Sequence, residues 1–123
     1  SALREVAQHT GARLVNVTLK LSRLLIDLPD RQRPHRLAEL LEQLIAAAEG
    51  DAVLLDHLEL LFLPALEQDP LRLLKQLSRG RALAAAWLGW YESGYLVYAE
   101  PGHAEYRRDA AHEVVVVELT AAP

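Results

Sequence analysis

Three ionisable side chains follow an apolar run near the middle of the sequence. Residues 52–55 read Ala-Val-Leu-Leu, and Asp56, His57 and Glu59 come next. An ionised carboxylate at the end of a buried run is costly unless a metal ion, a partner base or solvent stabilises it. Two chemistries fit these residue types: a carboxylate that orients a divalent cation, and a glutamate or histidine that acts as a general base. The structural alternative is that Asp56 caps the segment 58–62.

Composition limits the class of protein to which such a site can belong. The chain has 123 residues, of which 51% are hydrophobic, and we expect one domain over residues 1–123. A formal net charge of -4 disfavours a surface built for nucleic acid. The absence of cysteine excludes disulfides and thiolate zinc sites and predicts a cytoplasmic protein. No apolar run approaches the roughly 20 residues of a membrane span, so no membrane association is expected.

Hydrophobic periodicity predicts the elements that position the three side chains. Leucines at helical spacing from Leu37 onward predict a helix that ends before Gly50, and residues 52–55 are typical of a strand buried on both faces. Such alternation predicts a three-layered α/β domain with a mainly parallel sheet. The other expected elements are a helix over 2–9 that stops at Gly11, a helix over 22–28, and a helix over 70–79 capped by Asp69. Strands are expected over 13–21, 82–87 and 114–118, with 82–87 buried, and a hairpin over 90–98.

Two features of this arrangement point to a nucleotide site. In open parallel sheets, ligands bind beyond the carboxyl ends of the strands, and Asp56 is expected at such an end. An apolar strand that ends in aspartate has the form of a Walker B motif, in which the carboxylate orients Mg²⁺ beside phosphates. The sequence also opens inside the expected helix 2–9 without a cap. Removal of an initiator methionine explains this start; so does the loss of a preceding strand and phosphate loop.

Several blocks along the chain resemble one family, the small P-loop ATPases of type 3 BREX phage-defence systems (their F component). The resemblance covers nearly the whole chain and follows its order. Its blocks are 2–7, 15–17 with 21–22, 54–62, Asp-Pro-Leu-Arg-Leu-Leu at 69–74, Ser-Arg-Gly-Arg at 78–81, 84–87, Tyr-Ala-Glu-Pro-Gly-His at 98–103, and 105–107.

The resemblance implies a P-loop NTPase (RecA/AAA-like) fold without its first strand and phosphate loop. It implies Mg²⁺-dependent ATP binding, with other BREX components and further copies of the chain as partners. Asp56 would be the Walker B aspartate and the Mg²⁺ residue. The loop Gly-x-x-x-x-Gly-Lys-Ser/Thr is absent from the sequence. His57 stands where related ATPases place a glutamate, so Glu59 is the first candidate base and His57 the second, and ATP hydrolysis is left open.

Two arginines flank Gly80 between an expected helix and strand. Arg79 and Arg81 would lie at the amino end of that strand, opposite the nucleotide, and could reach a phosphate only in a neighbouring subunit, as a trans arginine finger does. The structural alternative is that they stay solvated at the carbonyl end of the helix.

Two other functions compete with an ATPase. A non-catalytic interaction module would present residues 58–66 and an aromatic hairpin to partner proteins. A DNA-binding subunit would use the basic loop of Arg31, Arg33 and Arg36, against the negative net charge. His9, His35, His103 and His112 show no metal-site spacing. The aromatic residues, expected in a core or a protein interface rather than against bases, are Trp87, Trp90, Tyr91, Tyr95 and Tyr98.

Overall fold

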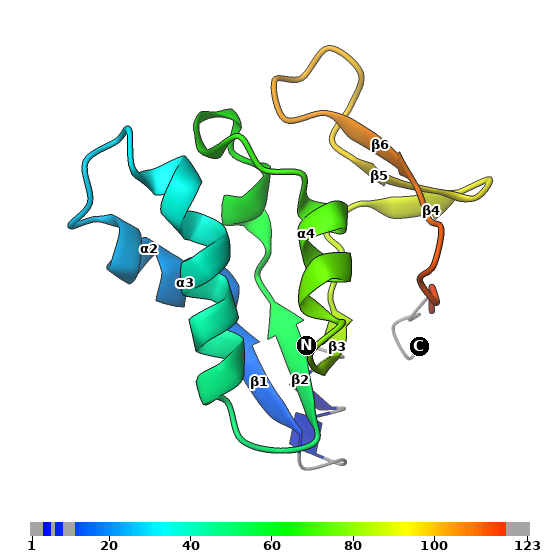
Figure 1. Cartoon of the computed structure of the whole chain (residues 1–123). Coiled ribbons are helices and arrows are strands. Elements are labelled where there is room, and N and C mark those ends of the chain that lie inside the picture. Colours follow the sequence, from blue (N-terminus) through cyan, green and yellow to red (C-terminus); the bar gives the residue numbers. More distant parts are fainter. Residues whose placement is uncertain (1–3, 6, 9–11, 118–123) are drawn as a thin grey trace.

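The computed structural model of the chain describes residues 4, 5, 7, 8 and 12–117 (Figure 1). Arg4, Glu5, Ala7 and Gln8 are helical, as expected, while the rest of the predicted helix 2–9 and its Gly11 stop lie outside the described residues. No helix in this described part is long and apolar enough to cross a membrane.

A three-stranded parallel sheet forms the centre of the fold. It consists of β1 (Arg13–Asn16), β2 (Ala52–Asp56) and β3 (Ala82–Ala85), with β2 in the middle. The three central residues of β2 are buried, which agrees with its uninterrupted apolar sequence. The prediction of an α/β protein with a parallel sheet is therefore confirmed. The expectation that β3 is buried is wrong, because three of its four residues are exposed.

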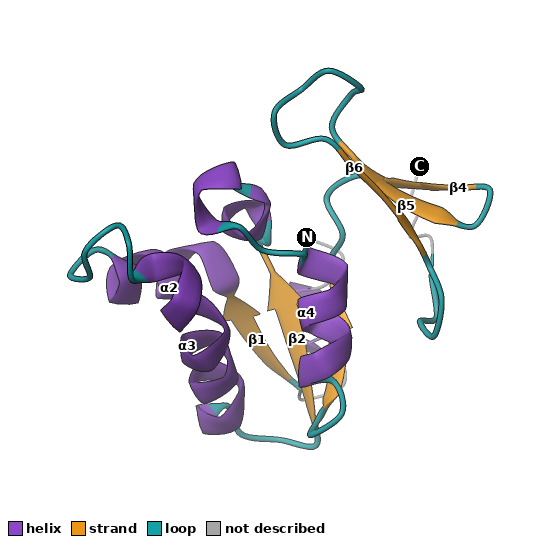
Figure 2. Ribbon diagram, turned by 45° about the horizontal axis from the view of Figure 1, so that its top comes forward, coloured by secondary structure: helices purple, strands orange, loops and turns teal. Residues whose placement is uncertain are grey.

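Helices cover one face of this sheet. The chain forms α2 (Val17–Leu25), α3 (Arg33–Ala47) and α4 (Pro70–Leu77), and Figures 1 and 2 show α3 and α4 on the same side of the strands. Two successive right-handed crossovers in one direction require this arrangement. The core lies between these helices and the sheet, and includes Val15, Val17, Leu21, Leu25, Leu37, Leu41, Ile45, Val53, Leu55, Leu58, Leu61 and Phe62.

The opposite face of the sheet has less cover than a three-layered fold provides. Leu14 belongs to this face, and it lines a hollow together with the helical residues Arg4, Ala7 and Gln8. No longer helix among residues 12–117 covers that side (Figure 2). The described residues thus show one full helical layer, and the third layer is not seen in them.

The predicted strand 13–21 is wrong beyond Asn16. The Asn16 side chain accepts a hydrogen bond from the Leu19 backbone N–H at 3.0 Å and so caps α2, which begins at Val17. Val17, Leu21 and Leu25 are all buried on one face of the helix. These apolar residues satisfy a period of four as well as a period of two, and the asparagine cap decides in favour of the helix.

The other helices follow their sequence signals. The helix predicted from Leu37 is confirmed, although α3 begins earlier, with Pro34 in its first turn. The Asp69 carboxylate accepts a hydrogen bond from the Arg72 backbone N–H at 3.2 Å and caps α4 as predicted. Between β2 and α4 the chain makes two short 3₁₀ turns, η1 (Glu59–Phe62) and η2 (Pro64–Leu66).

A second, antiparallel sheet follows the first. It is formed by β4 (Trp90–Glu92), β5 (Tyr95–Tyr98) and β6 (Arg107–Ala110). The predicted hairpin is confirmed, and Ser93 and Gly94 both have positive φ, as a tight hairpin turn requires. The polar strand β6 was not expected. The predicted strand 114–118 is wrong over 114–117, which are not in a strand; residue 118 lies outside the described residues.

Polar contacts hold the antiparallel sheet against the rest of the fold. The indole N–H of Trp87, just after β3, donates to the carbonyl oxygen of Val97 in β5 at 3.2 Å. The Arg107 guanidinium in β6 lies 3.3 Å from the Asp69 carboxylate at the start of α4. The antiparallel sheet is therefore held near the carboxyl ends of the parallel strands.

Candidate functional site

The three side chains noted in the sequence lie at the carboxyl end of the central strand. Asp56 is the last residue of β2 and pairs with Asn16 of β1. Its side chain is 15% exposed, whereas those of His57 and Glu59 are 51% and 46% exposed. The carboxylate of Asp56 is thus largely enclosed but still reaches the surface. A ligand or a metal ion could approach it from the exposed side.

His57 lies between the two carboxylates. Its backbone N–H donates to Asp56 Oδ1 at 3.0 Å, and its Nδ1 lies 3.4 Å from Glu59 Oε1. Its Nε2 lies 3.9 Å from Asp56 Oδ2. His57 also has a φ of 55°, a left-handed conformation in which histidine is enriched among non-glycine residues. Glu67, Ser93, Ala99 and Glu113 share a positive φ, so this conformation by itself does not mark the site.

Thr18, in the first turn of α2, holds this loop in place. Its hydroxyl lies 2.7 Å from the His57 carbonyl oxygen and 2.9 Å from Glu59 Oε2, and it accepts a hydrogen bond from the Leu60 backbone N–H at 3.1 Å. Its own backbone N–H donates to the His57 carbonyl at 3.0 Å. The hydroxyl therefore ties the candidate base to the end of the neighbouring strand.

Asp56 is not at the cap position of the turn that follows it, although its carboxylate accepts the His57 backbone N–H at the start of that segment. The 3₁₀ turn η1 has Leu58 at its cap position, and no side-chain hydrogen bond caps it there. The Leu60 backbone N–H is satisfied by Thr18 and not by Asp56. Nothing in the sequence pointed to Thr18, because its partners lie 39 to 42 positions further along the chain.

Electrostatics keep Glu59 ionised. Burial has the largest single influence and would raise the pKa of Glu59, but hydrogen bonds from its own backbone, Thr18 and His57, together with the charge of His57, outweigh burial and lower the pKa. The pKa of Tyr98 is raised, first by burial and then by the negative charges of Glu105 and Glu59. The second sheet thus contributes a neutral phenol to the surroundings of the site.

An aromatic cluster packs around Phe62, in the 3₁₀ turn η1 that also carries Glu59. Phe62 stacks on Tyr98 with ring centroids 3.8 Å apart and meets the Trp87 ring edge-on at 5.2 Å. These rings pack against one another, so the prediction of core packing holds for them. Trp90 and Tyr91 are 42% and 41% exposed.

The leucine-rich segment 58–66 is not the surface that an interaction module would present. Leu58, Leu61, Phe62 and Leu66 are buried, and Leu63 is 41% exposed. Most of the segment belongs to the core under the site, and residues 63–65 are its exposed part. A larger interaction surface has to be sought elsewhere.

The structure separates the two arginines from Asp56. Arg79 and Arg81 lie before β3, at the amino end of the sheet. The Arg81 guanidinium donates to the carbonyl oxygen of Ile45 at 2.7 Å and also to that of Gly50. A contact between Arg81 and a neighbour's phosphate would require these bonds to break. Arg79 is exposed and is the better placed of the two.

The basic loop is largely occupied by contacts within the chain. The Arg33 side chain donates to the carbonyl oxygens of Leu25 and Leu28 and pairs with Asp30 at 3.0 Å. Arg36 pairs with Glu39 at 3.2 Å. Arg33 therefore braces the turn between α2 and α3, whereas Arg36 pairs within α3.

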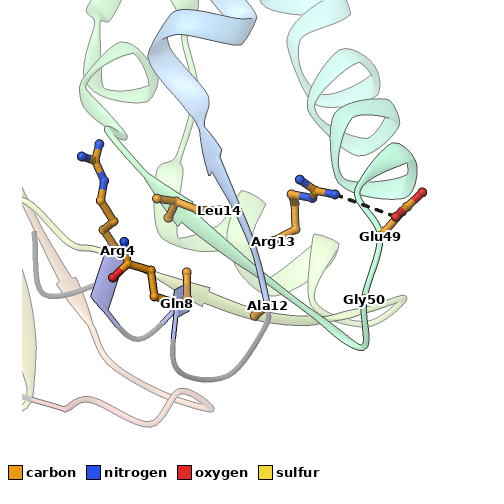
Figure 3. A pocket seen from close by; sticks show the side chains of 8 residues that line it. Arg4, Gln8, Ala12, Arg13, Leu14, Glu49 and Gly50 are labelled. Atoms are coloured by element: carbon orange, nitrogen blue, oxygen red, sulfur yellow. Dashed lines mark ion pairs between the residues drawn. The ribbon is translucent and has the colours of Figure 1, made fainter.

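A hollow lies at the opposite end of the sheet from Asp56. Its volume is about 620 Å³, and Figure 3 shows the Arg13–Glu49 ion pair, 3.8 Å long, beside Leu14 and Gly50. The carbonyl end of α3 lies next to Glu49, and this negative helix end disfavours a phosphate. We therefore place the candidate ligand site at the carboxyl ends of the strands and not in this hollow.

The donor set suits Mg²⁺ held jointly with a ligand. Among residues 4, 5, 7, 8 and 12–117 no group of three His, Asp or Glu side chains could hold a metal ion by itself. Mg²⁺ usually keeps several waters and is bound through one or two carboxylates together with substrate phosphates. A single enclosed aspartate beside an ionised glutamate matches that pattern.

No protein-family model, curated protein or solved structure matches the chain.

Proposed function

We propose that the chain is an ATP-binding, Mg²⁺-dependent component of a bacterial BREX anti-phage defence system, with a P-loop NTPase-like fold. The observation that carries the proposal is the position of Asp56 at the carboxyl end of the central parallel strand, beside His57. Open parallel sheets bind their ligands at this end. The assignment to a BREX system rests on the resemblance of the sequence blocks.

Each residue of the site has a distinct part in this proposal. Asp56 would orient Mg²⁺ through its water shell, and the metal would neutralise charge on the phosphates. Glu59 stays ionised and can accept a proton from water, with His57, 3.4 Å away, as the second candidate base. The sequence contains no phosphate loop, so these residues supply the metal side of a nucleotide site and not its phosphate cradle.

We also propose that Arg79 contacts the nucleotide site of a neighbouring subunit in an assembly of several chains. Arg79 is exposed and lies before the amino end of β3, whereas Asp56 lies at the carboxyl end of β2. It would therefore serve the site of a neighbouring subunit rather than its own. Arg81 already binds two carbonyl oxygens and is the weaker candidate. Further copies of the chain and other BREX components are the partners that we propose for such an assembly.

Calorimetric titration with Mg-ATP tests the proposal. We expect Asp56→Ala to weaken Mg-ATP binding at least about tenfold, a loss of about 1.4 kcal/mol. Asp51→Ala is the matched control, because Asp51 is an exposed aspartate at the other end of β2 and its removal should leave the affinity unchanged. In EDTA the variants should bind ATP equally. Unchanged binding by Asp56→Ala, or no binding by the native chain, would contradict the proposal.

One observation favours the second candidate, a protein-interaction module. Leu88, Trp90 and Tyr91 lie on or beside the edge strand β4, and each is at least 40% exposed. Exposed aromatics of this kind are enriched in protein interfaces. This candidate predicts partner binding that is unaffected by ATP and by Asp56→Ala, and lost on Trp90→Ala.

A further inference from the structure

The outer edge of β3 has no neighbouring strand among the described residues. β3 pairs with β2 on one side, and the sheet order ends there. Proteins usually protect such an edge with charged side chains, proline or a bulge. β3 reads Ala-Leu-Ala-Ala and has none of these, and three of its four residues are exposed. Arg81, just before it, turns its guanidinium to carbonyl oxygens at the end of α3 and not across the edge.

The same chain carries an apolar segment with high strand propensity and no strand partner in the described part of the chain. Residues 114–117 are four successive valines, and they are not in a strand. Val115 and Val117 are 92% and 71% exposed, while Val114 and Val116 are half-buried. This alternation is that of a strand with one face covered, and valine is among the residues most enriched in strands. Water is a poor surrounding for such a segment.

The edge and the valine segment match each other. Each is four residues long and without charge. The three exposed alanines of β3 leave room beside them for the branched valines, so a strand added at this edge would bury side chains that are exposed on both partners. In Figures 1 and 2 residues 111–117, which follow β6, run on the β3 side of the parallel sheet, away from β1.

We propose that residues 114–117 of one chain pair with the open edge of β3 in a second copy, in a reciprocal dimer. Within one chain the segment follows β6, which the Arg107–Asp69 contact holds at α4, and it is not paired with β3. Each copy has one open β3 edge and one valine segment. Two copies related by a two-fold axis can therefore pair both segments and leave neither β3 edge open.

Cross-linking tests the pairing directly, because the chain has no native cysteine. Ala84→Cys and Val115→Cys chains, prepared separately and mixed under mild oxidation, should form a mixed disulfide dimer. Lys20→Cys is the control in place of Ala84→Cys, since Lys20 is an exposed residue of α2, and it should not cross-link to Val115→Cys. A disulfide within a single Ala84→Cys/Val115→Cys chain that stays monomeric would overturn the second-copy proposal.

Sedimentation equilibrium provides an independent measurement. The native chain should reach twice its mass of 13.7 kDa, with or without nucleotide. Val115→Lys/Val117→Lys should weaken the dimer at least about tenfold and leave the circular dichroism unchanged, because both side chains are exposed in the single chain. A monomeric native protein, or a dimer that survives the double substitution, would overturn the proposal. Either result leaves the nucleotide proposal to its own test.

Discussion

Removal of the Thr18 hydroxyl should destabilise the loop that carries Glu59. Thr18→Val keeps the shape of the side chain but takes away the acceptor for the Leu60 backbone N–H and a donor to Glu59. A buried donor left without a partner costs about 1–3 kcal/mol. Water can reach this half-buried site in part, so we expect a loss of about 1–2 kcal/mol. For a domain of this size that corresponds to a fall in Tm of roughly 4–8 °C.

The effect of Thr18→Val should depend on pH. The pKa of Glu59 in the folded chain lies below its ordinary value of 4.5, so its charged form stabilises the fold above that value. This stabilisation is lost as the pH falls through the lowered folded-state pKa. Because Thr18 is one of the donors that lower the pKa, the loss of stability should be larger near about pH 7 than near about pH 3.

Urea unfolding followed by circular dichroism measures both effects. Thr18→Ser keeps the hydroxyl and should retain most of the pH dependence. Ser78→Ala is the control for an exposed hydroxyl, which donates to the Lys75 carbonyl at 2.8 Å, and should change stability by less than about 0.5 kcal/mol. If Thr18→Val matches the native stability, or loses the same amount at both pH values, the role given to Thr18 is wrong.

Four further substitutions test the contacts that hold the framework, each by urea unfolding. Asp69→Ala removes the cap of α4 and should cost about 1 kcal/mol; an unchanged midpoint would contradict the cap. Arg81→Ala should cost about 1–2 kcal/mol through its lost carbonyl contacts, and Arg79→Ala less than about 0.5 kcal/mol; equal effects would refute a structural role for Arg81. Gly89→Ala should cost about 2–3 kcal/mol because the added methyl overlaps the Val97 carbonyl; a stable variant would show that the backbones are further apart.

Strong local signals carried the correct parts of the sequence-based prediction. The helix α3 was identified from its leucine spacing, β2 from its uninterrupted apolar run, and the start of α4 from Asp69 followed by proline. Each signal lies within the element that it specifies. The position of Asp56 at a strand end followed from β2 alone.

The errors arose where contacts between distant residues decide the structure. The valines and leucines over 15–21 fit two periods, and the Asn16 cap made the second half a helix. Residues 114–117 have the composition of a strand, but a strand also needs a partner, which propensity does not supply. The sequence of β6 is polar and has no strand pattern. Its pairing with β5 and the contact of Arg107 with Asp69 at the start of α4 place it in the sheet.

The candidate site was predicted only in part for the same reason. Asp56, His57 and Glu59 are neighbours in sequence and their proximity was expected. Thr18 comes from another element, and its contacts with His57 and Glu59 appear only when β1 lies beside β2.

Binding of Mn²⁺ with ATP, followed by NMR, tests the central claim most directly. Mn²⁺ replaces Mg²⁺ and broadens the signals of nearby amides. The proposed site predicts selective broadening at His57, Leu58 and Thr18, and its loss in Asp56→Ala. Broadening centred on Arg13, Glu49 and Gly50, the residues of the hollow at the other end of the sheet, or broadening that persists in Asp56→Ala, would contradict the claim that Asp56 holds the metal beside a nucleotide.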